Sequence, residues 1–125
     1  MRPLNIMVVD DSNLTIKKMV KMIEDLGHKV VHVAQNGRQA AEDYPNVRPD
    51  LVTMDITMPD MDGIEATRRI LAVDDKAVIV MVTSHGQEQM VMDAIEAGAK
   101  GYVLKPVKAE KLAEHLEAVA GKYLS

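Results

Sequence analysis

The run AVIVMVTS (residues 77–84) decides the fold, because it is apolar without a break until it reaches two hydroxyl side chains. A strand with one face in water alternates apolar and polar residues. A strand covered on both faces is continuously apolar, as in parallel sheets packed between helices. Similar runs occur at residues 5–9, 30–33, 51–54 and 101–104. We therefore expect five buried strands in one parallel sheet.

Amphipathic segments separate these runs. Gly27 and Gly98 are expected to end the first and fourth helices, and Pro45 lies directly beyond the second. Leu14 is assigned to the apolar face of the first helix. The helices are expected at residues 14–26, 37–44, 64–71, 87–97 and 109–123. Strands and helices that alternate, with right-handed crossovers, predict an α/β fold: a doubly wound five-stranded parallel sheet flanked by five helices.

Composition limits the classes of function. The chain has 125 residues, the size of one domain, so we expect residues 1–125 to form a single domain. It contains no Cys, which excludes disulfides, thiolate zinc sites and Cys nucleophiles. The net charge of −4 argues against a nucleic-acid binder. With no secretory signal and no apolar stretch of about 20 residues, we expect a cytoplasmic protein without a membrane partner.

Polar side chains stand where the apolar runs stop. Ligands of open α/β sheets bind beyond the carboxyl ends of the strands, so these side chains should share one edge. They are Asp10 and Asp11 after the first run, Asp55 after the third, Thr83 and Ser84 at the end of the fourth, and Lys105 after the fifth.

These residue types suit phosphoryl transfer with a divalent cation. Carboxylates brought together repel one another and need a compensating cation, and oxygen ligands without His or Cys favour Mg²⁺ over Ca²⁺. A carboxylate can itself attack phosphorus to form an aspartyl phosphate. A lysine supplies a second positive contact to the transferred group. Each residue also has a plainer interpretation: Asp10-Asp11 or Thr83 as helix caps, and Lys105 as a solvated loop lysine.

Four segments strongly resemble the response-regulator receiver family, and most of all its single-domain chemotaxis (CheY-like) type. They are VVDDS (8–12), TMDITMPDMDG (53–63), VTS (82–84) and LKP (104–106). The resemblance covers essentially the whole chain. It implies a flavodoxin-like sheet in the order 2-1-3-4-5.

The resemblance also implies roles at the phosphorylation site. Asp55 would be the phosphoacceptor. Mg²⁺ would be held by Asp11, Asp55 and the backbone carbonyl of Thr57, with Asp10 helping through water. Lys105 would contact the phosphoryl group, and the bond between Lys105 and the following proline could be cis.

Four further positions concern switching and its rate. Thr83 would be the hydroxyl that moves toward the phosphoryl group, and Tyr102 the aromatic ring that then turns inward. Thr57 and His85 occupy the two flanking positions that tune dephosphorylation in this family.

The implied function is a two-component switch that catalyses only its own phosphorylation and dephosphorylation. A histidine kinase or phosphotransfer protein would supply the phosphoryl group. A protein target would bind the face formed by residues 87–97, the fifth strand and the last helix, with Tyr102, Gln89, Lys108, Lys111 and His115 as candidate contacts. We expect a monomer.

Several other functions were weighed. A phosphorelay shuttle, a phosphate sink or the receiver part of a larger regulator would have the same sequence features. An aspartate-nucleophile phosphatase is disfavoured because Thr57 stands where its second Asp is needed. A dinucleotide-binding protein lacks its glycine motif, and a degenerate interaction module would have lost key residues that are present here.

Overall fold

The computed structural model describes residues 2–84, 86 and 88–124. Its centre is a parallel sheet in the order β2-β1-β3-β4-β5, as the resemblance implied. The strands are β1 (Asn5–Val9), β2 (Lys29–Ala34), β3 (Leu51–Met54), β4 (Ile79–Thr83) and β5 (Gly101–Leu104).

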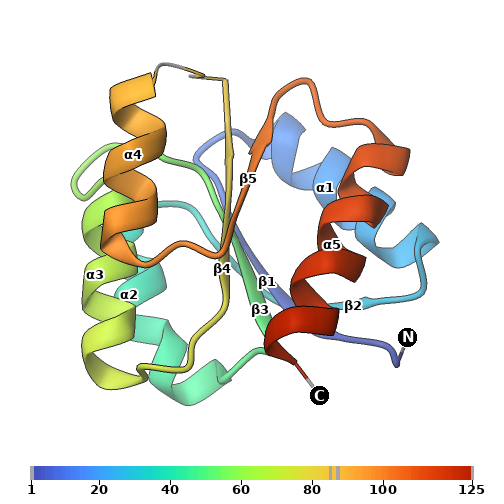
Figure 1. Ribbon diagram of the computed structural model, residues 1–125, viewed down its shortest axis with the longest axis horizontal. Helices are drawn as coiled ribbons and strands as arrows, with labels where there is room; N and C mark the ends of the chain where they lie inside the picture. Colours follow the sequence, from blue (N-terminus) through green and yellow to red (C-terminus); the bar gives the residue numbers. More distant parts are fainter. Residues whose placement is uncertain (1, 85, 87, 125) are drawn as a thin grey trace.

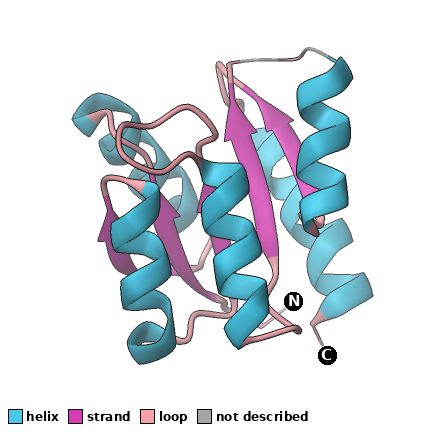
Figure 2. Ribbon diagram, turned by 90° about the vertical axis from the view of Figure 1, so that its left-hand side faces the viewer, coloured by secondary structure: helices cyan, strands magenta, loops and turns pink. Residues whose placement is uncertain are grey.

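Helices cover both faces of this sheet (Figure 1). α1 and α5 lie on one face, and α2, α3 and α4 lie on the other, so the doubly wound architecture is confirmed. Figure 2 shows the strands enclosed between the two helical layers. The helices are α1 (Asn13–Asp25), α2 (Gly37–Val47), α3 (Gly63–Val73), α4 (Glu88–Ala97) and α5 (Ala109–Tyr123).

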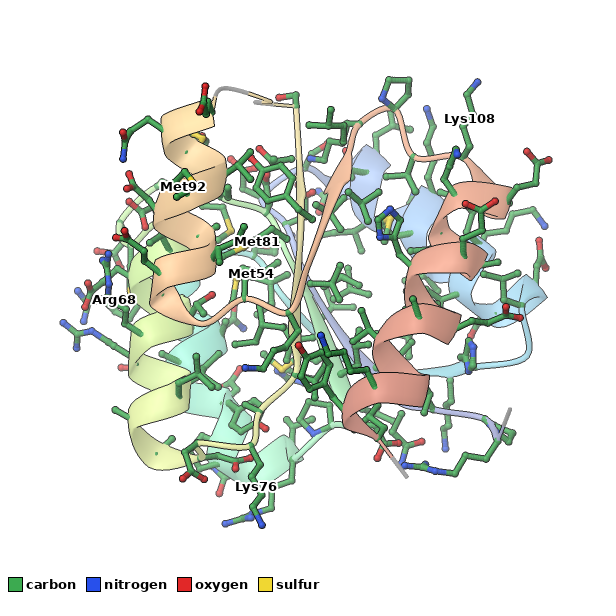
Figure 3. All side chains as sticks on the ribbon, viewed as in Figure 1. Met54, Arg68, Lys76, Met81, Met92 and Lys108 are labelled. Carbon is green, nitrogen blue, oxygen red and sulfur yellow. The ribbon has the colours of Figure 1, made fainter. Side chains whose placement is uncertain are left out.

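Each strand contributes alternate side chains to two separate cores. Met7 and Val9 of β1 face the α2–α4 side, whereas Ile6 and Val8 pack toward α1 and α5. Methionines fill much of the first core: Met54 and Met81 both point into it (Figure 3). Because both faces are covered, β1, β3 and β4 are buried almost throughout, which explains their continuous apolar sequence.

Several details differ from the sequence-based expectations. The second helix does not stop at Tyr44: α2 runs to Val47 with Pro45 inside it. The fourth strand begins at Ile79 rather than at residue 77. Leu14 is 64% exposed and does not belong to the buried face of α1.

The expected helix stops are present. Gly27 and Gly98 have φ angles of 91° and 110°, a left-handed conformation that glycine adopts without a steric penalty. Gln87, where the fourth helix was expected to begin, lies outside the described residues. No helix within the described part of the chain is long and apolar enough to cross a membrane.

Candidate functional site

Three carboxylates meet at the carboxyl edge of the sheet. Asp10 directly follows β1, Asp55 directly follows β3, and Asp11 is the next residue along from Asp10. One oxygen from each of the three lies within 4.8 Å of the others. Asp10 and Asp55 are buried, whereas Asp11 is exposed. The sequence-based prediction that these residues come together is confirmed, and the cluster has an open side.

Local hydrogen bonds hold the two buried carboxylates. The Ser12 amide donates to Asp10 Oδ1 (2.9 Å), and Ser12 itself caps α1 through its hydroxyl. The Asp55 amide donates to the Val9 carbonyl, which fixes its backbone to the end of β1. The Ile56 amide donates to Asp55 Oδ1 (2.9 Å). The helix cap is therefore Ser12, so the Asp10-Asp11 pair does not serve as the cap.

Lys105 reaches the same cluster from the end of β5. Its Nζ lies 2.8 Å from Asp10 Oδ2 and 3.7 Å from Asp55 Oδ1. Its side chain is only 21% exposed, so Lys105 is not a solvated loop lysine. The Lys105–Pro106 peptide bond is cis, as the resemblance implied. One ammonium thus partly compensates a group of three negative charges.

The electrostatics of the site act most strongly on Asp55. Burial raises the pKa of its carboxyl to about 6; the Lys105 ammonium opposes this shift, and the Asp10 carboxylate adds to it. Burial disfavours the charged form because the carboxylate loses hydration that the protein only partly replaces. An ionised Asp55 is consequently short of positive partners, and a divalent cation would relieve this deficit.

The oxygen donors fit a hard cation such as Mg²⁺. The three carboxylates offer oxygen atoms only, two of them are buried, and one side is open to water. Mg²⁺ usually retains several waters and takes one or two carboxylates, which matches an open cluster better than a closed cage. Thr57 lies two residues after Asp55 in the loop beside this cluster, and the residue is exposed.

Gly63 allows the loop after Asp55 to close tightly. Its amide donates to the Ile56 carbonyl (2.8 Å). A Cβ at this position would collide with the Asp55 carbonyl oxygen. Asp62 caps α3 by accepting from the Glu65 amide (2.9 Å). Sequence reasoning quoted Gly63 but missed this role; a glycine at a helix start, just after a capping residue, was the available signal.

The candidate switch residues lie on neighbouring strands. Thr83, at the end of β4, is fully buried, and its carbonyl accepts from the Lys105 amide (2.8 Å). Tyr102 on β5 pairs in register with Met81 of β4 and is half-buried; burial raises the pKa of its hydroxyl. His85, the second rate-tuning candidate, lies outside the described residues.

A hollow of about 340 Å³ opens beside Tyr102 on the outer side of β5 and α5. Lys108, Lys111 and His115 line it, so four of the five candidate contacts for a target share one surface. Gln89, the fifth, is on α4 and donates to Asp93 Oδ1 (2.8 Å).

Comparison with known proteins gives consistent matches. The family described as "Response regulator receiver domain" matches residues 6–117. The chain is 43% identical over 118 residues to a chemotaxis protein CheY of Listeria monocytogenes, covering 94% of this chain and 98% of that one. It is 48% identical over 113 residues to the CheY of Bacillus subtilis, covering 87% and 91%.

A solved structure shares the same fold. The CheX-CheY-BeF3-Mg+2 complex from Borrelia burgdorferi contains a chain that superposes with a TM-score of 0.90 at 35% identity. The superposition covers 94% of this chain and 89% of that one.

Proposed function

This chain belongs to the response regulator receiver domain family and is a two-component response regulator, and from that premise we propose that Asp55 is its phosphoacceptor. The proposal rests on the burial of Asp55 and on the charged side chains around it. Its carboxylate is buried at a strand end, within a cluster of two further carboxylates and one lysine. Its raised pKa and nearby ammonium distinguish it from a surface carboxylate.

Mg²⁺ would be held by Asp11, Asp55 and the backbone carbonyl of Thr57, with Asp10 helping through water. When bound, the cation supplies charge neutralisation for the phosphoryl oxygens and for the carboxylates. The open side next to exposed Asp11 leaves room for waters and for the incoming phosphoryl group.

The chain's own residues would perform the transfer. A carboxylate oxygen of Asp55 attacks the phosphorus of a phosphohistidine, the P–N bond breaks, and the imidazole nitrogen of the donor keeps the electron pair and takes up a proton. Lys105, already beside Asp55, moves to a phosphoryl oxygen. Water later attacks the phosphorus, the bond from phosphorus to the Asp55 oxygen breaks, and inorganic phosphate leaves the free carboxylate behind. Thr57 and His85, the two positions that tune dephosphorylation in this family, would set its rate.

The phosphoryl group would then bias a two-state element. It adds about −1.5 to −2 charges and three acceptor oxygens at one side chain. Thr83 lies at the end of the neighbouring strand, and its hydroxyl would turn toward those oxygens. Tyr102 would rotate inward once Thr83 has moved, changing the surface formed by α4, β5 and α5.

That surface is proposed as the output site. Tyr102, Lys108, Lys111 and His115 already share one hollow there, which a protein target could fill. We propose that the phosphodonor is a histidine kinase or a phosphotransfer protein, and that the setting is chemotaxis, because the relatives above carry that name. These names do not favour a phosphorelay shuttle or a phosphate sink.

Residues 1–125 would act as a single receiver domain and as a monomer in the cytoplasm, where ATP-dependent kinases operate. The chain would catalyse only its own phosphorylation and dephosphorylation. It would have neither a nucleic acid nor a membrane as partner.

Intact-protein mass after brief incubation with acetyl phosphate and Mg²⁺ tests this function. We expect a gain of one phosphoryl group that disappears with a chelator and in Asp55→Asn. If neither acetyl phosphate nor a histidine kinase produces a gain in the wild-type protein, Asp55 is not a phosphoacceptor.

A further inference from the structure

The loop between β3 and α3 carries the candidate site residues Asp55 and Thr57, and it contains one strained residue. Asp60 has a φ angle of 73°, in the left-handed region that non-glycine residues seldom occupy. Such a conformation persists only where surrounding contacts determine it, and these positions gather at functional sites. The contacts that hold Asp60 therefore help to fix the loop that carries Asp55 and Thr57.

One of these contacts lies within the loop, where the Met61 amide donates to the Pro59 carbonyl at 2.9 Å, and the others come from the start of α2. Arg38 Nε donates to Asp60 Oδ2 at 2.7 Å, a short charge-assisted hydrogen bond. The Gly37 amide donates to the carbonyl of Met61, the next residue of the loop, at 3.1 Å. A Cβ on Gly37 would collide with that same carbonyl oxygen. Two consecutive residues of α2, Gly37 and Arg38, are thus hydrogen-bonded to two consecutive residues of the loop, Met61 and Asp60.

The start of α2 is itself fixed. Asn36 caps the helix by accepting from the Gln39 amide at 2.8 Å. On the loop side, Met58 and Met61 are buried in the core. The Arg38 and Asp60 side chains are 51% and 49% exposed. Their ion pair therefore holds the solvent-facing side of the loop, whereas the inner side packs against the core.

We infer that Arg38 is a positioning residue for the cation site: through Asp60 it holds the β3–α3 loop so that the Thr57 carbonyl stays where a divalent cation can use it. This inference rests on the proposed function, since it assigns Arg38 to the same site. Arg38 would touch neither the cation nor the phosphoryl group.

The charge of Arg38 and its proposed positioning role predict opposite effects of neutralising Arg38 on Mg²⁺ affinity, so the two can be told apart. Removing a positive side chain near a cation site should tighten cation binding if only through-space electrostatics matters. If Arg38 positions the loop, neutralising it should weaken binding, just as neutralising Asp60 should. Exposed ion pairs contribute little, so the expected loss is about two- to fivefold in Mg²⁺ affinity.

The experiment is an NMR titration of the full chain with Mg²⁺, on the wild type, Arg38→Gln, Asp60→Asn and the double variant. Arg69→Gln is the matched control, because it neutralises another half-exposed arginine whose Nε lies 3.1 Å from Glu65 Oε2. Both single variants should bind Mg²⁺ about two- to fivefold more weakly than the wild type. The double variant should bind Mg²⁺ no more weakly than the weaker of the two single variants, because both substitutions break the same ion pair. The control variant should bind Mg²⁺ as tightly as the wild type.

A second measurement needs no cation. In the metal-free protein, hydrogen exchange of the Gly63 amide, which donates to the Ile56 carbonyl, should accelerate in Arg38→Gln. Unchanged or tighter Mg²⁺ binding by Arg38→Gln, with unchanged Gly63 exchange, would overturn the inference. A wild-type chain that binds no Mg²⁺ would instead overturn the proposed function and this inference together.

Discussion

Lys105 pairs more closely with Asp10 than with Asp55: its Nζ lies 2.8 Å from Asp10 Oδ2 and 3.7 Å from Asp55 Oδ1. The lysine thus neutralises mainly Asp10, the buried carboxylate beside the proposed acceptor, and Asp55 to a smaller extent. To contact a phosphoryl group on Asp55, it must weaken its bond to Asp10. A cation at the cluster would compensate Asp10 and ease that movement.

Lys105→Met should destabilise the metal-free protein, because it leaves Asp10 and Asp55 buried without their ammonium. Removing one partner of a fully buried ion pair costs about 3–5 kcal/mol. Lys105 is partly exposed, and Asp55 can take up a proton, so we expect a loss of about 1–3 kcal/mol in the free energy of unfolding at pH 7.5. Saturating Mg²⁺ should restore part of it. Urea unfolding with and without Mg²⁺ checks this, and an equal loss in both conditions would contradict it.

Asp55→Asn should stabilise the metal-free protein above pH 6. The pKa of Asp55 is raised from 3.8 to about 6 in the folded chain, so the folded state holds its proton more tightly than the unfolded state does. The ionised carboxylate therefore costs stability above pH 6, and this cost disappears as the pH falls from 6 toward 3.8. After allowance for solvent screening, we expect a gain of about 1–2 kcal/mol at pH 8. Unfolding curves at pH 8 and pH 4.5 measure the difference, and a gain independent of pH would argue against this origin.

His28 should make the fold sensitive to acid. Its Nδ1 accepts from the Leu4 amide at 3.0 Å, and burial together with the positive N-terminus lowers the pKa of the ring. The unfolded chain binds a proton near pH 6.5 while the folded chain resists it, so stability should fall as the pH drops below 6.5. Comparing His28→Gln with its parent, both in an Asp55→Asn background, isolates this effect from the opposite one of Asp55. Identical pH profiles would refute it.

Gly63→Ala should disturb the site directly. The added Cβ meets the Asp55 carbonyl oxygen, so the loop or the end of β3 must shift, and we expect a loss of about 1–3 kcal/mol. Gly121→Ala in α5 is the matched control. Among the described residues, no atom beyond its chain neighbours and the backbone of its own helix lies within 4 Å of its Cβ position, so it should stabilise the protein by about 0.5–1 kcal/mol. Thermal unfolding of the two variants should therefore move in opposite directions; a stable Gly63→Ala would mean that the loop is looser than described.

The sequence alone predicted the fold class well because the three central strands are buried on both faces. Continuous apolar runs such as residues 77–82 are typical of strands that helices cover on both sides. The errors have local causes. Leu14 stands two residues before Ile16, about 200° around the helix, and so faces solvent. Pro45 lies in the last turn of α2, where its missing N–H costs a single hydrogen bond, and the Arg48 amide still donates to Tyr44.

The site was predictable only in part. Parallel strands end at one edge, so the meeting of Asp10, Asp11 and Asp55 followed from the positions of the strand ends. Lys105 lies closer to Asp10 than to Asp55 because of side-chain conformations, which cannot be predicted from the spacing of residues in the sequence. The link from Arg38 to Asp60 joins two exposed residues from different segments, and charge pairs of this kind cannot be assigned before the loops are placed.

The central claim is that Asp55 itself carries the phosphoryl group, and mapping the acyl phosphate tests it most directly. After incubation with acetyl phosphate and Mg²⁺, borohydride reduces an aspartyl phosphate to homoserine, and mass spectrometry of peptides then locates the homoserine. The account predicts homoserine at position 55 alone, and none after incubation without Mg²⁺. Homoserine at position 10 or 11, with position 55 unmodified, would contradict it.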